Sequence, residues 1–235
     1  LFPYTTLFRS RLFEHVPEIT PVADLDTRQQ ATIDVRVIQT RQTGGPTLFR
    51  VTDGSGIAVA SAYTAAGVRA YPLVEVGDVV RISGEMEEHA GTHQLEVSSL
   101  ERLDAEAAAD VDAAIDAAIA EAARPAVPDP LIEWPAFAPL YAELAEVAEQ
   151  LRRYILEGRP VVIRHHADGD GMCGAVPLEQ AIRRFMTELY PDPETARHLL
   201  RRRPSKAPYY ELEDVTRDLQ AARAAQERHG QQMPV

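Results

Sequence analysis

Hydrophobic and polar positions alternate along the first half of the chain, and this alternation predicts β structure from about residue 32 to residue 103. Every second residue from Ile33 to Val37 is apolar, the period of a strand with one buried face. Asp53-Gly54-Ser55-Gly56 is typical of a hairpin turn. The expected strands are Thr32–Thr40, Leu48–Thr52, Ile57–Ala62, Val79–Gly84 and Gln94–Leu100. Five strands with a short connector between the third and the fourth have the order of an OB-fold β-barrel.

A helical period replaces the alternation after residue 103. Residues 104–124 are rich in Ala, Asp and Glu and carry apolar residues four apart, and prolines follow up to Pro135. This stretch predicts a helix and a stiff linker. The next helix has one apolar face, formed by Leu140, Leu144, Val147, Leu151 and Ile155.

The last hundred residues predict a strand between helices. The apolar run Val161–Ile163 precedes a loop, and a helix follows whose Pro177 fits only its first turn. Asp192-Pro193 predicts the start of a further helix, which is expected to end at Arg201-Arg202-Arg203-Pro204. This order suits one layer of a parallel α/β sheet.

Four segments result from these patterns. Residues 1–10 resemble a translated sequencing adapter and are expected not to be native. Residues 29–103 form the OB-fold, residues 104–135 the helix and proline-rich linker, and residues 136–235 the α/β part. The expected fold class is therefore multidomain, a β-barrel followed by a parallel-sheet α/β domain.

Composition narrows the setting of the protein. The net charge is −12, and Lys206 is the only lysine among 24 basic residues. An acidic, lysine-poor chain indicates either a halophilic host or a GC-rich genome. The single cysteine, Cys173, excludes an internal disulfide and is expected to be a small buried helix residue. One cysteine fits a reducing cytosol, so a cytoplasmic protein is expected. No apolar run is long enough to span a membrane.

The loop after the apolar run concentrates chemistry-bearing side chains, because His166, Asp168 and Asp170 follow one another at every second position. Imidazole and carboxylate ligands suit manganese, and two such ions can activate water for phosphodiester hydrolysis. Asp168 and Asp170 are then the expected catalytic residues, hinged by Gly169 and Gly171.

Two other interpretations of this loop fit less well. The Gly-x-Gly-x-x-Gly spacing from Gly169 to Gly174 matches a dinucleotide fingerprint, but Asp168 and Asp170 would repel a pyrophosphate. An EF-hand loop would need a glutamate where Pro177 stands.

Residues 161–171 and the helix after them resemble the DHH phosphoesterase superfamily, above all archaeal RecJ-like exonucleases. The resemblance implies that His166, Asp168 and Asp170 belong to the first metal-binding motif, with Mn²⁺ or Mg²⁺ as cofactor, two ions in the full-length protein. The later motifs, including Asp-His-His, are absent from this sequence. It thus resembles a fragment, inactive by itself, whose remaining metal ligands lie elsewhere.

The predicted barrel resembles OB-folds of nucleic-acid-binding proteins, through Phe49–Gly56 and Val76–Gly84. Phe49 itself is expected in the core. Single-stranded DNA or RNA is the implied partner, alongside replisome or repair proteins and without a membrane. The candidate nucleic-acid contacts are Arg36, Arg50, Tyr63, Arg69, Arg202, Arg203 and Lys206.

The expected function is therefore a metal-dependent single-strand exonuclease acting in DNA repair or replication. Two alternatives stay open. One is a non-catalytic replication or repair scaffold with the same fold. The other is a phosphodiesterase acting on short oligonucleotides or cyclic dinucleotides.

Overall fold

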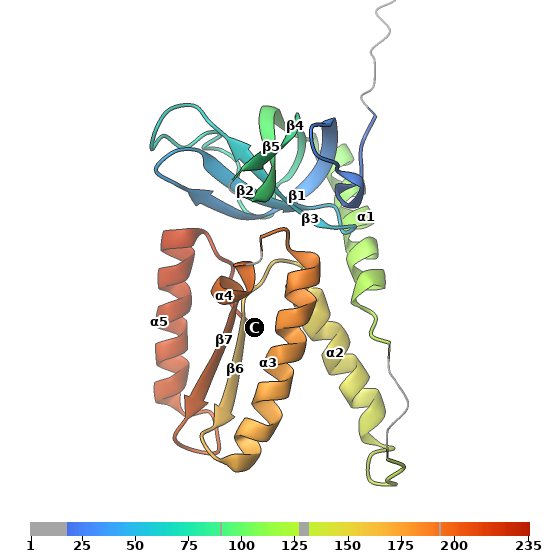
Figure 1. The fold of residues 1–235 in the computed structure, drawn as a ribbon, viewed down its shortest axis with the longest axis vertical. Helices are drawn as coiled ribbons and strands as arrows, with labels where there is room; N and C mark the ends of the chain where they lie inside the picture. The colour runs from blue at the N-terminus through green and yellow to red at the C-terminus, as the bar shows by residue number, and fades with distance from the viewer. Residues whose placement is uncertain (1–17, 90, 127–131, 193) are drawn as a thin grey trace, which may run out of the picture.

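A computed structural model describes residues 18–89, 91–126, 132–192 and 194–235 (Figure 1). The segment 1–10, predicted to be adapter-derived, lies outside these residues. So do Pro128 and Pro130 of the predicted linker and Pro193 of the predicted helix start.

The N-terminal part is a closed barrel of five antiparallel and parallel strand pairs, as the alternation predicted. The strands run in the order β1-β2-β3-β5-β4 around the barrel. Their bounds are β1 Gln30–Gln42, β2 Thr47–Thr52, β3 Ile57–Ala62, β4 Val79–His89 and β5 Thr92–Arg102. β4 and β5 extend beyond the predicted ends, because residues 85–89 pair with residues 92–96 in a long hairpin.

Alternating side chains fill the barrel. Ile33, Val35 and Val37 of β1 are fully buried, and the residues between them are half-buried. Phe49 is fully buried as well, which confirms the prediction that it belongs to the core. A short 3-10 helix, Val22–Asp24, precedes the barrel and places Val22 in the same core.

Helix α1, Ala105–Ala123, follows the last strand and packs on the barrel. Asp104 caps it by accepting hydrogen bonds from the backbone N–H groups of Glu106 and Ala107, at 3.1 and 2.9 Å. Ile115 and Ile119 are buried, as their four-residue spacing predicted. Helix α2, Leu140–Leu156, packs against α1 at its C-terminal half.

Only part of the predicted apolar face of α2 is covered. Ile155 is buried and Leu151 is half-buried, whereas Leu140, Leu144 and Val147 are 44%, 56% and 65% exposed. The helix is therefore confirmed, but the N-terminal half of its apolar face contacts solvent.

The C-terminal part consists of two parallel strands and three helices. β6, Val161–His166, pairs in parallel with β7, Leu200–Ser205. α3, Gly169–Leu189, and α5, Leu212–His229, lie on opposite sides of the two strands, and the short α4, Thr195–Leu199, leads into β7 (Figure 1). Val235 exchanges two backbone hydrogen bonds with residues 160 and 162, the pattern of a parallel strand beside β6.

Two sequence predictions in this part are wrong. Pro177 lies in the interior of α3 and not in its first turn, because the cap at Asp168 starts the helix at Gly169, eight residues before the proline. The run Arg201-Arg202-Arg203-Pro204 is strand β7 and not a helix end, because its backbone continues the parallel ladder beside β6.

The barrel sits at the end of the sheet where β6 and β7 begin (Figure 1). Ile38 of β1 and Ile57 of β3 are buried in the same cluster as Val161 and Leu200, so the two parts share a core. Gln232 donates hydrogen bonds to the carbonyls of Ile38 and Glu157 across this junction. Among the described helices, none pairs the length with the apolar content that crossing a bilayer demands.

Candidate functional site

The turn between β6 and α3 holds the side chains that the sequence singled out. Asp168 is the N-cap of α3, and its Oδ1 accepts a hydrogen bond from the backbone N–H of Gly171 at 3.0 Å. A Cβ at position 171 would lie 2.2 Å from the carbonyl oxygen of His166 and 2.9 Å from Asp168 Oδ1. Glycine at 171 thus permits the close approach of the helix start to the end of the strand.

His166 and Asp168 lie on the same side, as their spacing predicted, and contact each other directly. His166 Nδ1 is 2.5 Å from Asp168 Oδ2, and His166 Nε2 is 3.1 Å from the carbonyl oxygen of Lys206. The hydrogen bond from the Gly171 N–H, assisted by His166, lowers the pKa of Asp168 despite partial desolvation.

Asp170 was predicted to act beside Asp168, but among the described residues its side chain has no hydrogen bond to His166 or Asp168. It lies in the first turn of α3, where its side chain is exposed, because the helix begins directly at Gly169 and leaves no extended loop. Cys173 is also exposed on α3, so the prediction of a buried thiol is wrong.

The described residues do not form a metal centre by themselves. No three His, Cys, Asp or Glu side chains among them lie close enough to hold one ion. Both ring nitrogens of His166 and both oxygens of Asp168 already have hydrogen-bonding partners within the chain. In this arrangement the turn offers at most part of a ligand set.

A network of ion pairs on the α5 side of the sheet was missed by the sequence analysis. Asp218 of α5 accepts two hydrogen bonds from Arg164 of β6, at 2.8 Å each, one from Arg203 of β7 at 2.6 Å and one from the Tyr210 hydroxyl at 3.0 Å. Burial opposes ionisation of Asp218, but Arg164 and its other partners lower its pKa. Asp214, buried one turn earlier, accepts a further bond from Arg164.

The sequence contained a signal for this network. Arg164 directly follows the apolar run Val161–Ile163 of a strand expected between helices, and a charge in such a position requires a partner. Asp214 and Asp218 are four residues apart, which places both carboxylates on one helical face.

The seven predicted nucleic-acid contacts differ in their availability. Arg36 is paired with Asp112 and Asp116 of α1. Arg69 donates to the carbonyl of Val74. Tyr63 and Lys206 are exposed, and Tyr63 is 66% accessible on the barrel.

Arg202 and Arg203 lie on opposite faces of β7. Arg202 pairs with Glu179 of α3 and lies 3.1 Å from Nε2 of His165, while Arg203 pairs with Asp218. His165 therefore has packing and hydrogen-bonding partners rather than a place beside Asp168. These internal pairs fix both arginines within the α/β part.

Arg50 occupies the junction between the two parts. Its guanidinium donates to Gln39 Oε1 at 2.6 Å and to Thr195 Oγ1 at 3.3 Å, and lies 5.3 Å from the centre of the Tyr190 ring. Burial lowers the pKa of Arg50 and raises that of Tyr190, whose hydroxyl donates to the carbonyl of Ile155 at 2.8 Å.

The molecule therefore consists of a barrel of the OB type and, joined to it, a unit of parallel strand, turn and helix that holds His166 and Asp168. Residues 31–103 match the family of OB-fold nucleic acid binding domains. The chain is 36% identical over 244 residues to MJ1198, an uncharacterized protein of Methanocaldococcus jannaschii. That alignment covers all of this chain and 32% of the relative, so the chain spans about a third of the relative's length.

A solved structure resembles a large part of the chain. It is described as a DHH domain of a member of the s1p family of ribosomal proteins and is 38% identical, with a TM-score of 0.54. The match covers 55% of this chain and 30% of the other. These similarities support an OB-fold combined with a DHH-like part.

Proposed function

We propose that this chain belongs to a divalent-metal-dependent phosphoesterase, a RecJ-like exonuclease that acts in the cytoplasm on single-stranded DNA or RNA during repair or replication. The observation that carries the proposal is the attachment of an OB-fold barrel to a strand–turn–helix unit whose turn holds His166 against Asp168. The DHH domain of the similar solved structure supports the phosphoesterase class.

The barrel is the proposed nucleic-acid binding element. OB-folds bind oligonucleotides on the face of their second and third strands and through adjacent loops. Exposed Tyr63 follows β3 directly and offers a stacking surface for a base.

His166, Asp168 and Asp170 are the proposed contribution of this chain to a site for Mn²⁺ or Mg²⁺, with two ions in the complete enzyme. Because no three ligands gather among the described residues, we propose that the other ligands come from outside these 235 residues. Bound ions would supply Lewis acidity and activated water. The hydrogen bonds of Asp168 with the Gly171 N–H and with His166 orient its carboxylate and lower its pKa.

Two measurements test the proposal. Fluorescence anisotropy with labelled oligothymidylate and oligouridylate should show binding of single strands by the 235-residue chain, with no manganese-dependent cleavage of them. In the full-length protein, Asp170→Asn should abolish cleavage, because it removes a proposed metal ligand. Binding should stay unchanged, because Asp170 is exposed and its side chain has no hydrogen-bonding partner among the described residues. Glu188→Gln, an exposed carboxylate on the same helix, is the matched control.

The internal bonds of the turn favour one alternative, a non-catalytic scaffold, because His166 and Asp168 satisfy each other without a cation. A full-length protein that binds single strands but leaves them intact in Mn²⁺ would support the scaffold and reject the exonuclease. Robust cleavage by the 235-residue chain alone would show that the site needs no further ligands.

A further inference from the structure

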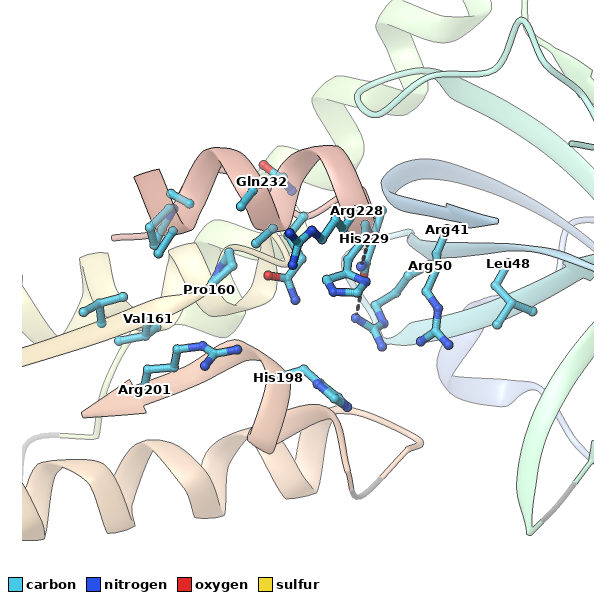
Figure 2. Close-up of a pocket in the computed structure, with 18 of the residues that line it drawn as sticks. Arg41, Leu48, Arg50, Pro160, Val161, His198, Arg201, Arg228, His229 and Gln232 are labelled. Atoms are coloured by element: carbon cyan, nitrogen blue, oxygen red, sulfur yellow. Dashed lines mark hydrogen bonds between the residues drawn. The ribbon is translucent and has the colours of Figure 1, made fainter. Parts of the chain in front are cut away.

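A cleft of about 800 Å³ lies between the outer face of the barrel and the α/β part (Figure 2). Residues of β1 and β2 form one wall, and residues of β7 and α5 form the other. The cleft is at the end of the sheet where β6 begins, on the side of α5, and therefore differs in location from the turn that holds His166 and Asp168.

Positive charge dominates this cleft although the chain as a whole carries a net charge of −12. Two carboxylates line it, and one of them, Asp218, is already paired with Arg164 and Arg203. The arginines that line it are Arg41, Arg50, Arg201, Arg203 and Arg228.

Three of these arginines have side chains free to receive an anion. Arg41, Arg201 and Arg228 are exposed, and within the described part of the chain none of them has a hydrogen-bonding or ion-pair partner. They belong to β1, β7 and α5, and Figure 2 shows them around the same space. Elements from both parts of the molecule thus contribute cations to one cleft.

Arg50 provides an independent observation in favour of an anion site. Its guanidinium has hydroxyl, amide and aromatic neighbours but no carboxylate within hydrogen-bonding distance, and its Nε is buried without a partner. Asp192 attracts the guanidinium from a greater distance and Arg41 repels it, but burial outweighs both and lowers the pKa of Arg50. A buried guanidinium without a hydrogen-bonded counter-charge is costly, and a ligand anion in the cleft would provide that bond.

The shape and lining of the cleft indicate which anion it takes. No Phe, Tyr or Trp is among its lining residues, and its rings are the imidazoles of His198 and His229, whereas five guanidiniums lie along its length. Guanidinium groups match phosphate oxygens bidentately. The barrel wall includes Leu48 and Arg50 of β2 and Val59 of β3, on the face where OB-folds bind oligonucleotides.

We propose that this cleft binds the sugar-phosphate backbone of a single nucleic-acid strand held on the barrel, with Arg41, Arg201 and Arg228 as phosphate contacts. The proposal rests on the proposed function in one respect, the binding of nucleic acid by the barrel. It adds that the α/β part contributes contacts at the junction and that recognition there is independent of base sequence.

The test compares two triple variants of the 235-residue chain in anisotropy titrations with labelled oligothymidylate over a range of salt concentrations. Arg41→Gln/Arg201→Gln/Arg228→Gln removes the three free cations of the cleft. Arg124→Gln/Arg184→Gln/Arg217→Gln removes the same charge from arginines whose side chains are 68%, 84% and 62% exposed and which do not line the cleft. Circular dichroism melts establish that both variants remain folded.

Each phosphate contact to a single strand contributes about 0.7 to the slope of log K against log salt concentration. Three lost contacts should therefore reduce the slope by about 2 and weaken binding about 100-fold near 0.1 M salt. The control variant should keep the wild-type slope and bind within about threefold of wild type, because distant exposed charges are largely screened.

The outcomes separate the two proposals. If the wild-type chain binds no single strand, nucleic-acid binding by the barrel is rejected. If it binds and both triple variants weaken binding equally, the barrel remains the binding element and the cleft proposal is overturned. An increase of the melting temperature by inorganic phosphate that only the cleft variant loses, with unchanged oligonucleotide affinity, would identify a small-anion site and equally overturn it.

Discussion

Asp218 is the residue whose removal should damage the α/β part most, because its carboxylate joins three elements. It accepts four hydrogen bonds, from Arg164 of β6, Arg203 of β7 and Tyr210 before α5. Its side chain is 11% exposed, and those of Arg164 and Arg203 are 18% and 29% exposed. Asp218→Asn keeps the volume but removes the charge and turns an amide N–H₂ toward donors.

The magnitude follows from the burial of the partners. Removing one member of a buried ion pair costs about 3–5 kcal/mol, since the other charge is left uncompensated. Water still reaches part of both guanidiniums and screens the charges, so we expect a smaller loss than this, about 2–3 kcal/mol. For a chain of this size that loss lowers the melting temperature by about 5–10 °C.

The free energy of unfolding is measured by urea unfolding monitored with circular dichroism. The melting temperature is measured by differential scanning calorimetry. Glu188→Gln is the control, because its pair with Arg184 is 64% and 84% exposed and is worth at most about 1 kcal/mol. A free energy of unfolding for Asp218→Asn within about 0.5 kcal/mol of that control would refute the argument that the carboxylate joins the two strands to α5.

Three further predictions follow from particular contacts. Gly171→Ala should cost about 1–3 kcal/mol in the free energy of unfolding, because its Cβ would meet a carbonyl oxygen of β6 at 2.2 Å, whereas Gly174→Ala, with open space around it, should be neutral or stabilising. Gly54→Ala should cost about 2 kcal/mol or more in the same measurement, since the residue has φ +86° and its Cβ would lie 2.6 Å from an alanine side chain of α1; an unchanged value would contradict the packing of α1 on the hairpin. Hydrogen bonds from Arg202 lower the pKa of Glu179, and the pKa of Asp218 is lowered as well. Both carboxylates therefore contribute stability above about pH 4, and this contribution is lost as the pH falls further. Urea unfolding at several pH values should show that acid lowers the free energy of unfolding of Asp218→Asn less than that of the wild type.

The barrel could be predicted from the sequence because its information is local. Burial alternates along β1, β3 is a short run buried at nearly every position, and Asp53-Gly54-Ser55-Gly56 joins β2 to β3 as a hairpin. The ends of β4 and β5 could not be predicted, because residues 85–89 are polar and their strand conformation depends on cross-strand pairing rather than on burial.

The α/β part was harder to predict, because long-range pairing overrides local preference there. Three successive arginines in front of a proline resemble a helix end, yet they form a parallel strand whose faces are set by Glu179 on one side and Asp218 on the other. The sequence correctly placed His166 beside Asp168 but could not show that α3 begins at Gly169, since that depends on the cap made by Asp168.

The positions of the barrel and the turn constrain how any substrate could use both. The cleft beside the barrel is at the beginning of β6, and the turn with His166 and Asp168 follows its end (Figure 1). Six residues of strand separate the two by roughly 20 Å. A stacked nucleic-acid single strand that keeps the duplex rise of about 3.4 Å per nucleotide needs about six nucleotides to cover that distance. Oligonucleotides shorter than this can contact the barrel or the turn but not both.

An exonuclease that depends on the barrel should therefore lose cleavage efficiency steeply below that length, whereas an enzyme for cyclic or dinucleotide substrates should show no such threshold. Cleavage rates of the full-length protein on a ladder of oligothymidylates distinguish the two, and a flat dependence on length would separate the function of the barrel from the chemistry at the turn.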